Sequence, residues 1–159
     1  NKESEQWLYL PAIKRSKKIF SREKIRSFMG SDFSYEDIKP RDIDEDTYEI
    51  LGQENLDGKK YYKIKATPIK ISIYSKRIIW VDKDESLISK IEFYDKDNQI
   101  KKIMTIPKVK RHGDYLTILK MEMENIEKSQ LTTIELLDIS YDNELEESFF
   151  SKESLIEER

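Results

Sequence analysis

The chain has 159 residues, 38% of them charged, a formal net charge of −3 and no cysteine. This length suits one domain, which buries roughly 70% of its unfolded surface and holds a core without disulfides. The lack of cysteine excludes disulfides and thiolate metal sites, and the nearly balanced charge argues against nucleic acid as a partner. The aromatic content of 11% is too high for a disordered chain. We therefore expect one folded domain over residues 1–159.

The first predicted strands lie at residues 7–10 and 13–20, after a short polar lead. No signal-peptide pattern and no membrane-length apolar stretch are present in the sequence. Because the chain opens so abruptly on a strand, we expect further elements of the domain upstream of Asn1. The stretch SREKIRSF at 21–28 predicts one or two helical turns capped by Ser21.

The stretch FMGSDFSYEDI, residues 28–38, places large apolar groups between carboxylates in a spacing that fits no helix or strand face. Gly30 supplies a permissive backbone joint. A connection normally runs over the surface, where aromatic groups have little to pack against. Residues 28–46 also form the only long irregular connection, and connections of this length are usually functional. We expect a lid or plug.

Most of the remaining sequence alternates apolar and polar residues, which is typical of half-buried strands. In LKMEMEN, Leu119, Met121 and Met123 fall on one face and the charged residues on the other. Residues 62–66 and 87–94 repeat this pattern. Looser strands are predicted at 47–54, 75–82, 100–110 and 130–141. Turn-like connections at 55–59, 82–86, 95–99 and 111–115 indicate hairpins, so the whole predicts an antiparallel meander of about nine strands.

An alternating sheet has one apolar face that must be hidden. Little helix is predicted to cover it, apart from residues 21–28 and a terminal turn at 151–159 capped by Ser151. The predicted fold class is therefore mainly β, with an antiparallel sheet curved into an incomplete half-barrel and a lid made of a loop and short helix. The plainer interpretation of Met121 and Met123 is ordinary core packing.

Metal and cofactor sites are not predicted. The single histidine, His112, lies in the turn RHGD without a paired ligand and is expected to be exposed. Residues 42–53 superficially resemble a calcium loop, but Thr47 stands where glycine is required and Gln53 where glutamate is required.

Catalysis is not predicted either, since no nucleophile elbow or phosphate-binding glycine loop is present. Acid–base pairs need burial, whereas one run of carboxylates is expected to be solvated: Asp42, Asp44, Glu45 and Asp46. We therefore expect a protein that is not an enzyme.

Two blocks of opposite charge follow one another near the N-terminus. The basic block contains Lys14, Arg15, Lys17, Lys18, Arg22, Lys24 and Arg26. The acidic block contains Asp32, Glu36, Asp37, Asp42, Asp44, Glu45 and Asp46. The plain interpretation is two solvated faces that attract each other across the lid. The functional interpretation is that the basic block meets anionic headgroups or an acidic partner.

Five stretches together carry a family likeness: QWLYLPAIKRSKKI, FMGSDFSYEDI, YEILGQENLDGKKYYKIKATP, IIWVDKDESLISKIEFYDKDNQIKKI and LLDISYDNELEESFFSKESL. They resemble the outer-membrane lipoprotein-sorting protein family, the LolA/LolB-like group, and are closest to its uncharacterised branch. The resemblance covers essentially the whole chain. It implies an antiparallel sheet curved into an incomplete barrel around an apolar cavity, closed by helices and loops. It also implies export, because members are exported and the lipoprotein carriers among them take acyl chains across the periplasm.

The same resemblance implies that a helix and several strands precede the first strand of this chain, so the sequence corresponds to the C-terminal part of the family domain. A sheet edge left exposed in this way is a candidate for pairing with another copy of the chain.

The preferred hypothesis is a non-enzymatic periplasmic carrier of an acylated lipoprotein or lipid, without a cofactor. The residues predicted to gate entry are Phe28, Met29, Phe33 and Tyr35. The residues predicted to line the site are Tyr62, Ile64, Ile91, Phe93, Leu119, Met121 and Met123. The alternative hypothesis is an envelope protein-interaction or sensor domain of the same fold, without lipid cargo.

Overall fold

The computed structural model describes residues 6–20, 23, 25–151 and 153–155. Two antiparallel sheets account for the strands, a two-stranded hairpin and a seven-stranded meander in the order β3-β4-β5-β6-β7-β8-β9. The hairpin consists of β1 (Gln6–Leu10) and β2 (Arg15–Ile19). The meander consists of β3 (Asp46–Leu56), β4 (Lys59–Pro68), β5 (Lys76–Asp82), β6 (Ile88–Tyr94), β7 (Ile100–His112), β8 (Tyr115–Asn125) and β9 (Gln130–Glu135). The predicted fold class is confirmed: the protein is mainly β, and its antiparallel sheet is not closed into a barrel.

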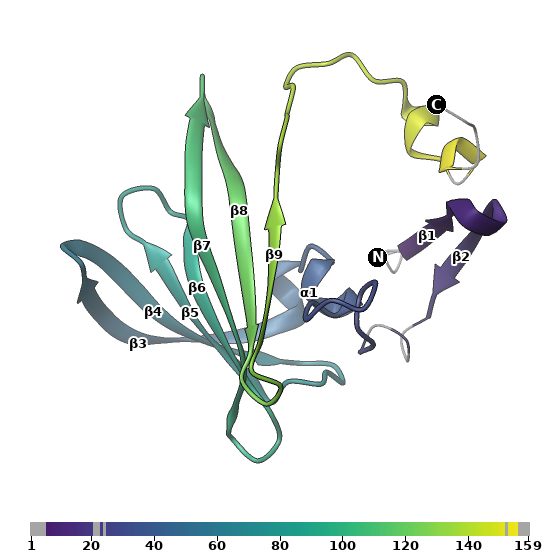
Figure 1. Ribbon diagram of the computed structural model, residues 1–159. Helices are drawn as coiled ribbons and strands as arrows, with labels where there is room; N and C mark the ends of the chain where they lie inside the picture. The colour runs from purple at the N-terminus through teal and green to yellow at the C-terminus, as the bar shows by residue number, and fades with distance from the viewer. Residues whose placement is uncertain (1–5, 21–22, 24, 152, 156–159) are drawn as a thin grey trace.

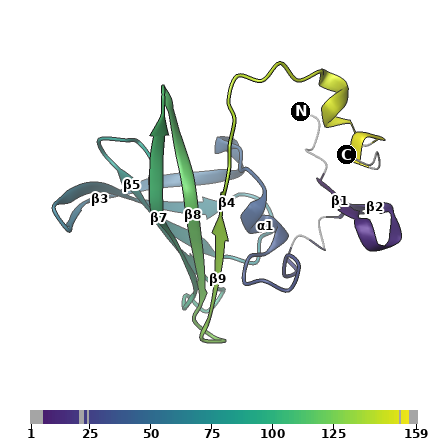
Figure 2. The same cartoon turned by 45° about the horizontal axis from the view of Figure 1, so that its top comes forward.

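The seven-stranded sheet is strongly curved, with β3 and β9 at its two open edges (Figure 1). Its concave face encloses α1 (Tyr35–Ile38), which lies between the two edges (Figure 2). The hairpin β1–β2 lies apart from this sheet, near the C-terminal 3-10 turns η4 (Glu147–Phe150) and η5 (Glu153–Leu155) (Figure 1).

The strand register confirms the predicted faces of β8. Met123 is fully buried and Met121 packs against the core, whereas Lys120 and Glu122 form an ion pair of 2.7 Å on the opposite face. One row of cross-strand neighbours runs over the concave face from edge to edge: Ile50, Ile64, Ile79, Ile91, Met104, Met123 and Thr132. Apolar side chains at alternate positions therefore do line the inside of the curve.

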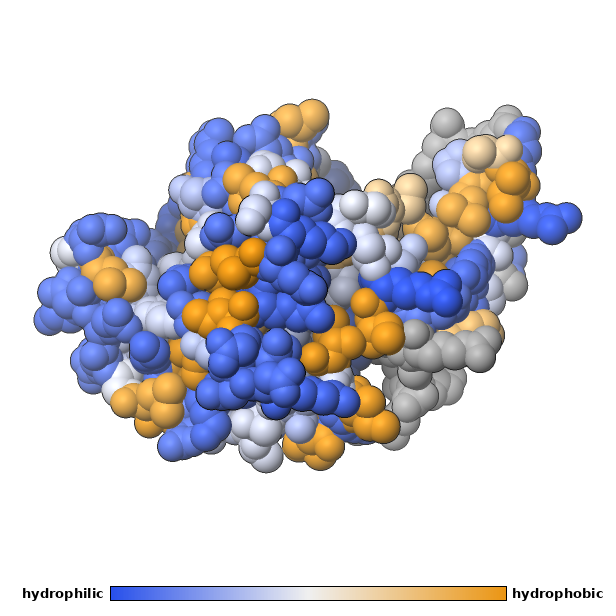
Figure 3. All heavy atoms as spheres, turned by 60° about the horizontal axis from the view of Figure 1, so that its bottom comes forward, coloured by the Kyte–Doolittle hydropathy of each residue, from blue (hydrophilic) through white to orange (hydrophobic). Residues whose placement is uncertain are grey.

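The outer face is charged but not uniformly exposed. Trp80 is only 4% exposed there, because Lys63 and Lys90 lie over its ring at 4.8 and 4.5 Å and Glu54 accepts its Nε1–H at 2.9 Å. Seen from the lower end of the sheet, hydrophobic atoms form separate patches between charged side chains (Figure 3). The lysine stems cover apolar surface while their ammonium groups stay at the surface.

The core is small and lies on the concave side of β5 to β9. Its buried hydrophobic members are Phe33, Tyr74, Ile91, Phe93 and Met123. Phe33 comes from the segment 28–38, so this segment completes the core instead of lying over solvent. We call residues 28–38 the plug.

The last strand is the one that falls furthest short of its predicted range. We expected a strand over 130–141, but β9 ends at Glu135. One further backbone hydrogen bond continues the pairing with β8, from the Leu136 N–H to the Leu119 carbonyl. The chain then passes the first residues of β8, where Tyr141 stacks on Tyr115 at 4.3 Å and shares a hydrogen bond with Thr117. Stacking and a side-chain hydrogen bond, not ladder pairing, hold this segment.

The predicted helical turns differ in outcome. Ser21, the predicted cap of a helix at 21–28, lies outside the described residues, as do Arg22 and Lys24. The C-terminal cap is confirmed, because the Ser154 N–H donates to Ser151 Oγ at 3.2 Å at the start of η5. The other short turns are η1 (Pro11–Ile13) and η3 (Ile43–Glu45). No helix in the described part of the chain has the length and hydrophobicity needed to cross a membrane.

Candidate ligand-binding face

Asp32, near the start of the plug, attaches it to the last two strands, β8 and β9. The Asp32 N–H donates to Thr132 Oγ1 at 3.0 Å, and the same hydroxyl donates to Asp32 Oδ2 at 2.7 Å. The Asn125 amide donates to Asp32 Oδ1 at 3.3 Å. Phe33 follows directly and is 2% exposed. The polar contacts therefore fix where the aromatic ring enters the core.

The helix α1 within the plug was not predicted, although its signal is present in the sequence. Ser34 and Asp37 form a capping box, in which the Ser34 N–H donates to Asp37 Oδ2 at 2.7 Å and the Asp37 N–H donates to Ser34 Oγ at 3.2 Å. The spacing S-x-x-D is that of a helix start. This cap turns the chain so that Asp37 points into the core.

Asp37 attaches the other end of the plug. Its carboxylate accepts hydrogen bonds from Lys102 Nζ at 3.1 Å and from the Tyr74 hydroxyl at 2.9 Å. Burial, together with the charge and hydrogen bond of Asp37, raises the pKa of Tyr74 far above its usual range. Lys102 stands opposite Phe93 on the inner face, so a charged pair spans the sheet and the plug.

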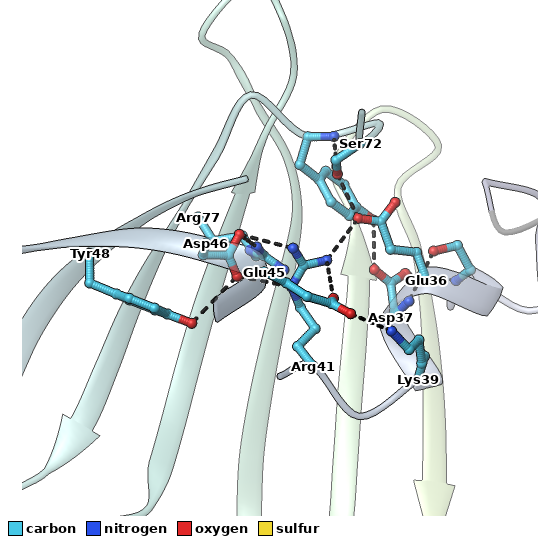
Figure 4. Close-up of polar contacts among 11 residues, drawn as sticks. Glu36, Asp37, Lys39, Arg41, Glu45, Asp46, Tyr48, Ser72 and Arg77 are labelled. Atoms are coloured by element: carbon cyan, nitrogen blue, oxygen red, sulfur yellow. Dashed lines mark hydrogen bonds and ion pairs between the residues drawn. The ribbon is translucent and has the colours of Figure 1, made fainter. Parts of the chain in front are cut away.

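A second set of charges lies beside α1, at the start of β3 (Figure 4). Arg41 donates to both oxygens of Asp46 at 3.0 and 2.9 Å and to Glu36 at 3.2 Å. Arg77, on β5, also donates to Asp46, and Ser72 donates to Glu36 at 2.6 Å. Burial lowers the pKa of Arg77, and the charge of Arg41 lowers it further. We call Glu36, Arg41, Asp46 and Arg77 the ion cluster.

The ion cluster corrects one expectation. Asp42 and Asp44 are exposed, as expected, but Asp46 is only 6% exposed and is surrounded by two guanidinium groups. A sequence cannot show that Arg77, 31 positions away, returns to the same place. In the acidic block, Asp37 and Asp46 pair with Lys102, Arg41 and Arg77, all of which lie outside the basic block. Asp32, also buried, accepts hydrogen bonds from Asn125 and Thr132 instead.

The residues predicted to gate entry divide between core and solvent. Phe33 is in the core, and Phe28 packs against it while meeting Tyr35 edge to face at 5.4 Å. Met29 is 67% exposed, at a left-handed backbone position with φ of 51°. The aromatic surface of the plug is therefore turned mainly toward the sheet.

The residues predicted to line a site divide along the sheet. Ile91, Phe93 and Met123 lie under the plug in the core, and Met121 packs at its margin. Tyr62 is exposed, and Ile64 and Leu119 are half-buried. Along the central row, exposure falls from 71% at Ile50 to 0% at Met123. The concave face thus has a part that the plug covers, on β6 to β9, and a part that stays open, on β3 and β4 and toward the upper ends of β8 and β9.

Two hollows flank the upper and outer sides of β8, and neither includes a plug residue. The inner one has a volume of about 390 Å³ and lies where β9 leaves β8. It is lined by Lys108, Lys110, His112, Leu119, Glu135, Leu136, Leu137, Asp138 and Ile139. The other, of about 600 Å³, lies on the outer face. It is lined by Ile103, Thr105, Glu122, Glu124, Ile126, Ser129, Gln130 and Leu131.

His112 differs from its expectation. It is half-buried, its Nε2 atom is fully buried without a hydrogen-bond partner, and its ring lies 6.5 Å from that of Tyr141. Among the residues that the structure describes, no group of three or more His, Asp or Glu side chains is arranged to hold a metal ion. A metal role for His112 therefore has no support from neighbouring ligands.

A family model described as "Uncharacterized protein" matches residues 1–157 of the sequence. The chain belongs to this family. No protein with a curated description matches the sequence. Solved structures of relatives do match, and their descriptions point to the lipoprotein-sorting group that the sequence resembles.

A putative outer membrane lipoprotein-sorting protein domain from Vibrio parahaemolyticus is 35% identical, with a TM-score of 0.91 over 96% of this chain and 66% of that one. A DUF1329 family protein from Desulfovibrio piger is 32% identical, with a TM-score of 0.89 over 95% and 64%. A LolA superfamily protein from Nitrosomonas europaea is 20% identical, with a TM-score of 0.66 over 94% and 67%. The predicted likeness to the LolA/LolB-like group is confirmed, and the chain spans about two thirds of the length of these relatives.

Proposed function

We propose that this protein is a non-enzymatic carrier that binds the acyl chain of a lipid or lipoprotein in the periplasm. The observation that carries the proposal is the incomplete cover of the concave face. The plug buries Ile91, Phe93 and Met123, but Ile50 and Tyr62, on the same face, remain 71% and 37% exposed. Exposed apolar surface in a concave region usually marks a place where a ligand binds.

The binding energy of an acyl chain would come from burial alone. Each methylene removed from water contributes about 0.8 kcal/mol. Half-buried Ile64 on β4 stands next to Ile50, and Ile79 on β5 follows it at the margin of the core, so the open surface on β3 and β4 leads directly to the core. Flexible Met121, which packs at the margin of the core on β8, would adapt to chains of different shape. No step of this function requires a catalytic group.

The relatives support the biological setting of the proposal. One is described as a putative outer membrane lipoprotein-sorting domain and another as a LolA superfamily protein. We infer that the chain acts in outer-membrane lipoprotein sorting, and that its cargo is an acylated lipoprotein or a lipid. Phe28 and Met29, at the plug margin, would guide the chain toward Tyr62 and Leu119.

Native mass spectrometry of the protein, purified without detergent from bacterial envelopes, tests the proposal. We expect a co-purifying lipid or acylated peptide, and binding of dodecyl maltoside at micromolar concentration after the native ligand is removed. If neither lipid, fatty acid nor lipopeptide binds at that concentration, the carrier function is wrong.

The outer hollow favours a second candidate function, an envelope protein-interaction domain without lipid cargo. Glu122 and Glu124 line it together with Ile103 and Leu131, and Leu131 is 61% exposed. A basic, partly apolar segment of a partner would complement this surface. Crosslinking in envelopes separates the two functions, since this candidate requires a protein adduct that Glu122→Lys abolishes while lipid binding stays unchanged.

A further inference from the structure

The inner hollow at the upper end of the sheet differs from the rest of the concave face because it is lined by charged groups as well as leucines. Lys108, Lys110 and His112 contribute from β7 at alternate positions. Leu119 contributes from β8, and residues 135–139 close the other side where the chain leaves β9. At about 390 Å³, the hollow lies within the range of small-ligand sites.

The two ammonium groups of this hollow have no partners within the part of the chain that the structure describes. The side chains of Lys108 and Lys110 make no ion pair or hydrogen bond there, although Glu135 and Asp138 also line the hollow. His112 Nε2 is buried without a partner. A buried polar atom of this kind normally finds a partner, because leaving it without one costs about 1–3 kcal/mol.

The two carboxylates of the same hollow lie close to other donors or cations. Asp138 Oδ1 accepts the Ile139 N–H at 2.9 Å. Glu135 stands opposite Lys120 in the β8–β9 ladder. The pKa of Lys120 is raised by its hydrogen bond to Glu122 and also by the charge of Glu135, so the two groups interact. Glu135 interacts with Lys120 and Asp138 with the neighbouring N–H, whereas the ammonium groups of Lys108 and Lys110 make no such contact, so the complementary ligand group is an anion.

The apolar lining connects this polar end to the open concave face. Leu136 lies beside Leu119, to which its N–H donates at 2.9 Å through the backbone, and Leu119 shares the inner face of β8 with Met121. Ile134, the cross-strand neighbour of Met121, continues this surface toward the plug. An extended acyl chain that starts in the hollow would follow these side chains along β8.

We propose that the hollow at Lys108, Lys110 and His112 binds the anionic headgroup, a phosphate or a carboxylate, of an amphiphile whose acyl chain lies along the inner face of β8. This inference rests on the proposed carrier function and assigns the polar end of its ligand. The lysines supply the charge, and the His112 ring forms part of the wall beside them.

His112 offers a direct test because it is the only histidine in the chain. Its ring protons are therefore identified without assignment in a one-dimensional NMR spectrum. At constant pH, we expect butyl phosphate at millimolar and dodecyl phosphate at micromolar concentration to shift these signals. Dodecyl maltoside, which has the same chain but no charge, should bind without reproducing the shift. Comparison of dodecyl phosphate with dodecanoate shows whether a phosphate or a carboxylate is preferred.

Charge removal provides the second test. The double variant Lys108→Gln/Lys110→Gln should weaken dodecyl phosphate binding about tenfold, as expected for loss of charge-assisted contacts, and change dodecyl maltoside binding less than about twofold. The matched control is Lys96→Gln/Lys128→Gln, which removes the same charge from the exposed hairpins at the opposite end of the sheet. Equal weakening by both double variants would overturn the headgroup site, since it would indicate only general attraction.

The outcomes separate the two proposals. If dodecyl maltoside binds but no anion moves the His112 signals, the headgroup site is wrong and the carrier function stands. If butyl phosphate moves them but a longer chain adds no affinity and dodecyl maltoside does not bind, the carrier function is wrong and the anion site stands.

Discussion

The two parts of the concave face are built from the same alternating strands, yet the side chains of one are buried and those of the other are exposed. Under the plug, Phe33 and Met123 are almost fully buried, and Asp37 and Asp46 bind cationic side chains. Toward β3 and the upper ends of β8 and β9, Ile50 and Leu137 are 71% and 91% exposed. The difference shows that an alternating sheet supplies an apolar face but does not decide how much of it becomes core. A separate segment, held by specific polar contacts, decides that.

The polar contacts also explain why the covered part stays covered. A buried charge that loses its partner is strongly destabilising, so displacement of the plug from these contacts is unfavourable. Asp32 binds β8 and β9, Asp37 binds Lys102 on β7, and Glu36 binds Arg41 and Ser72. The plug is thus fixed in one register on the sheet, and the open part of the face remains open.

The largest expected effect comes from the centre of the covered part. Phe33→Ala should lower the free energy of unfolding by about 3–5 kcal/mol, because the ring is 2% exposed and its removal leaves a cavity among Tyr74, Phe93 and Met123. Urea denaturation measures this change. Met29→Ala is the matched control, since Met29 belongs to the same plug but is 67% exposed, and its effect should stay within about 0.5 kcal/mol. Similar effects of the two substitutions would mean that the plug does not complete the core.

A moderate effect is expected from the protonation of Tyr74. Burial and Asp37 raise the pKa of its hydroxyl, so the folded state keeps this proton above pH 10, where the unfolded state releases it. The stability that this group contributes is fully present below pH 10 and is lost as pH rises toward the folded pKa. The loss is about 1.4 kcal/mol per pH unit.

Urea denaturation at pH 9, 10 and 11 measures this dependence, with Tyr74→Phe as the comparison. Other tyrosines contribute equally to both proteins, including Tyr94, whose pKa burial and Glu92 raise to about 12. The variant should be less stable at pH 9, because its hydrogen bond to Asp37 is lost, but should decline less steeply between pH 10 and 11. Parallel curves for the two proteins would show that Tyr74 ionises freely in the folded state.

Sequence patterns predicted the sheet well but not the division of its concave face. Period-two alternation in residues 119–125 predicts the strand and its buried face, because burial of one face imposes that pattern. Lys102 shows the limit: it stands on the inner face, where alternation predicts an apolar residue, and its partner Asp37 is 65 positions away. Pairing over such a distance leaves no local signal in a single sequence. The same holds for Arg77 with Asp46, whereas the capping box at Ser34 was readable from its spacing.

The smallest expected effect on stability, but a clear one on binding, comes from the open part of the face. Ile50→Ser should change the free energy of unfolding by at most about 1 kcal/mol, since the side chain is 71% exposed on an edge strand. It should weaken dodecyl maltoside binding several-fold, because Ile50 extends the apolar row of Ile64 and Ile79 on the inner face. Leu131→Ser is the control, since Leu131 is 61% exposed on the outer face of the opposite edge strand. Isothermal titration of both variants measures these effects. Equal affinities would place the acyl chain away from β3, and a loss at Leu131 alone would place it on the outer side of the sheet.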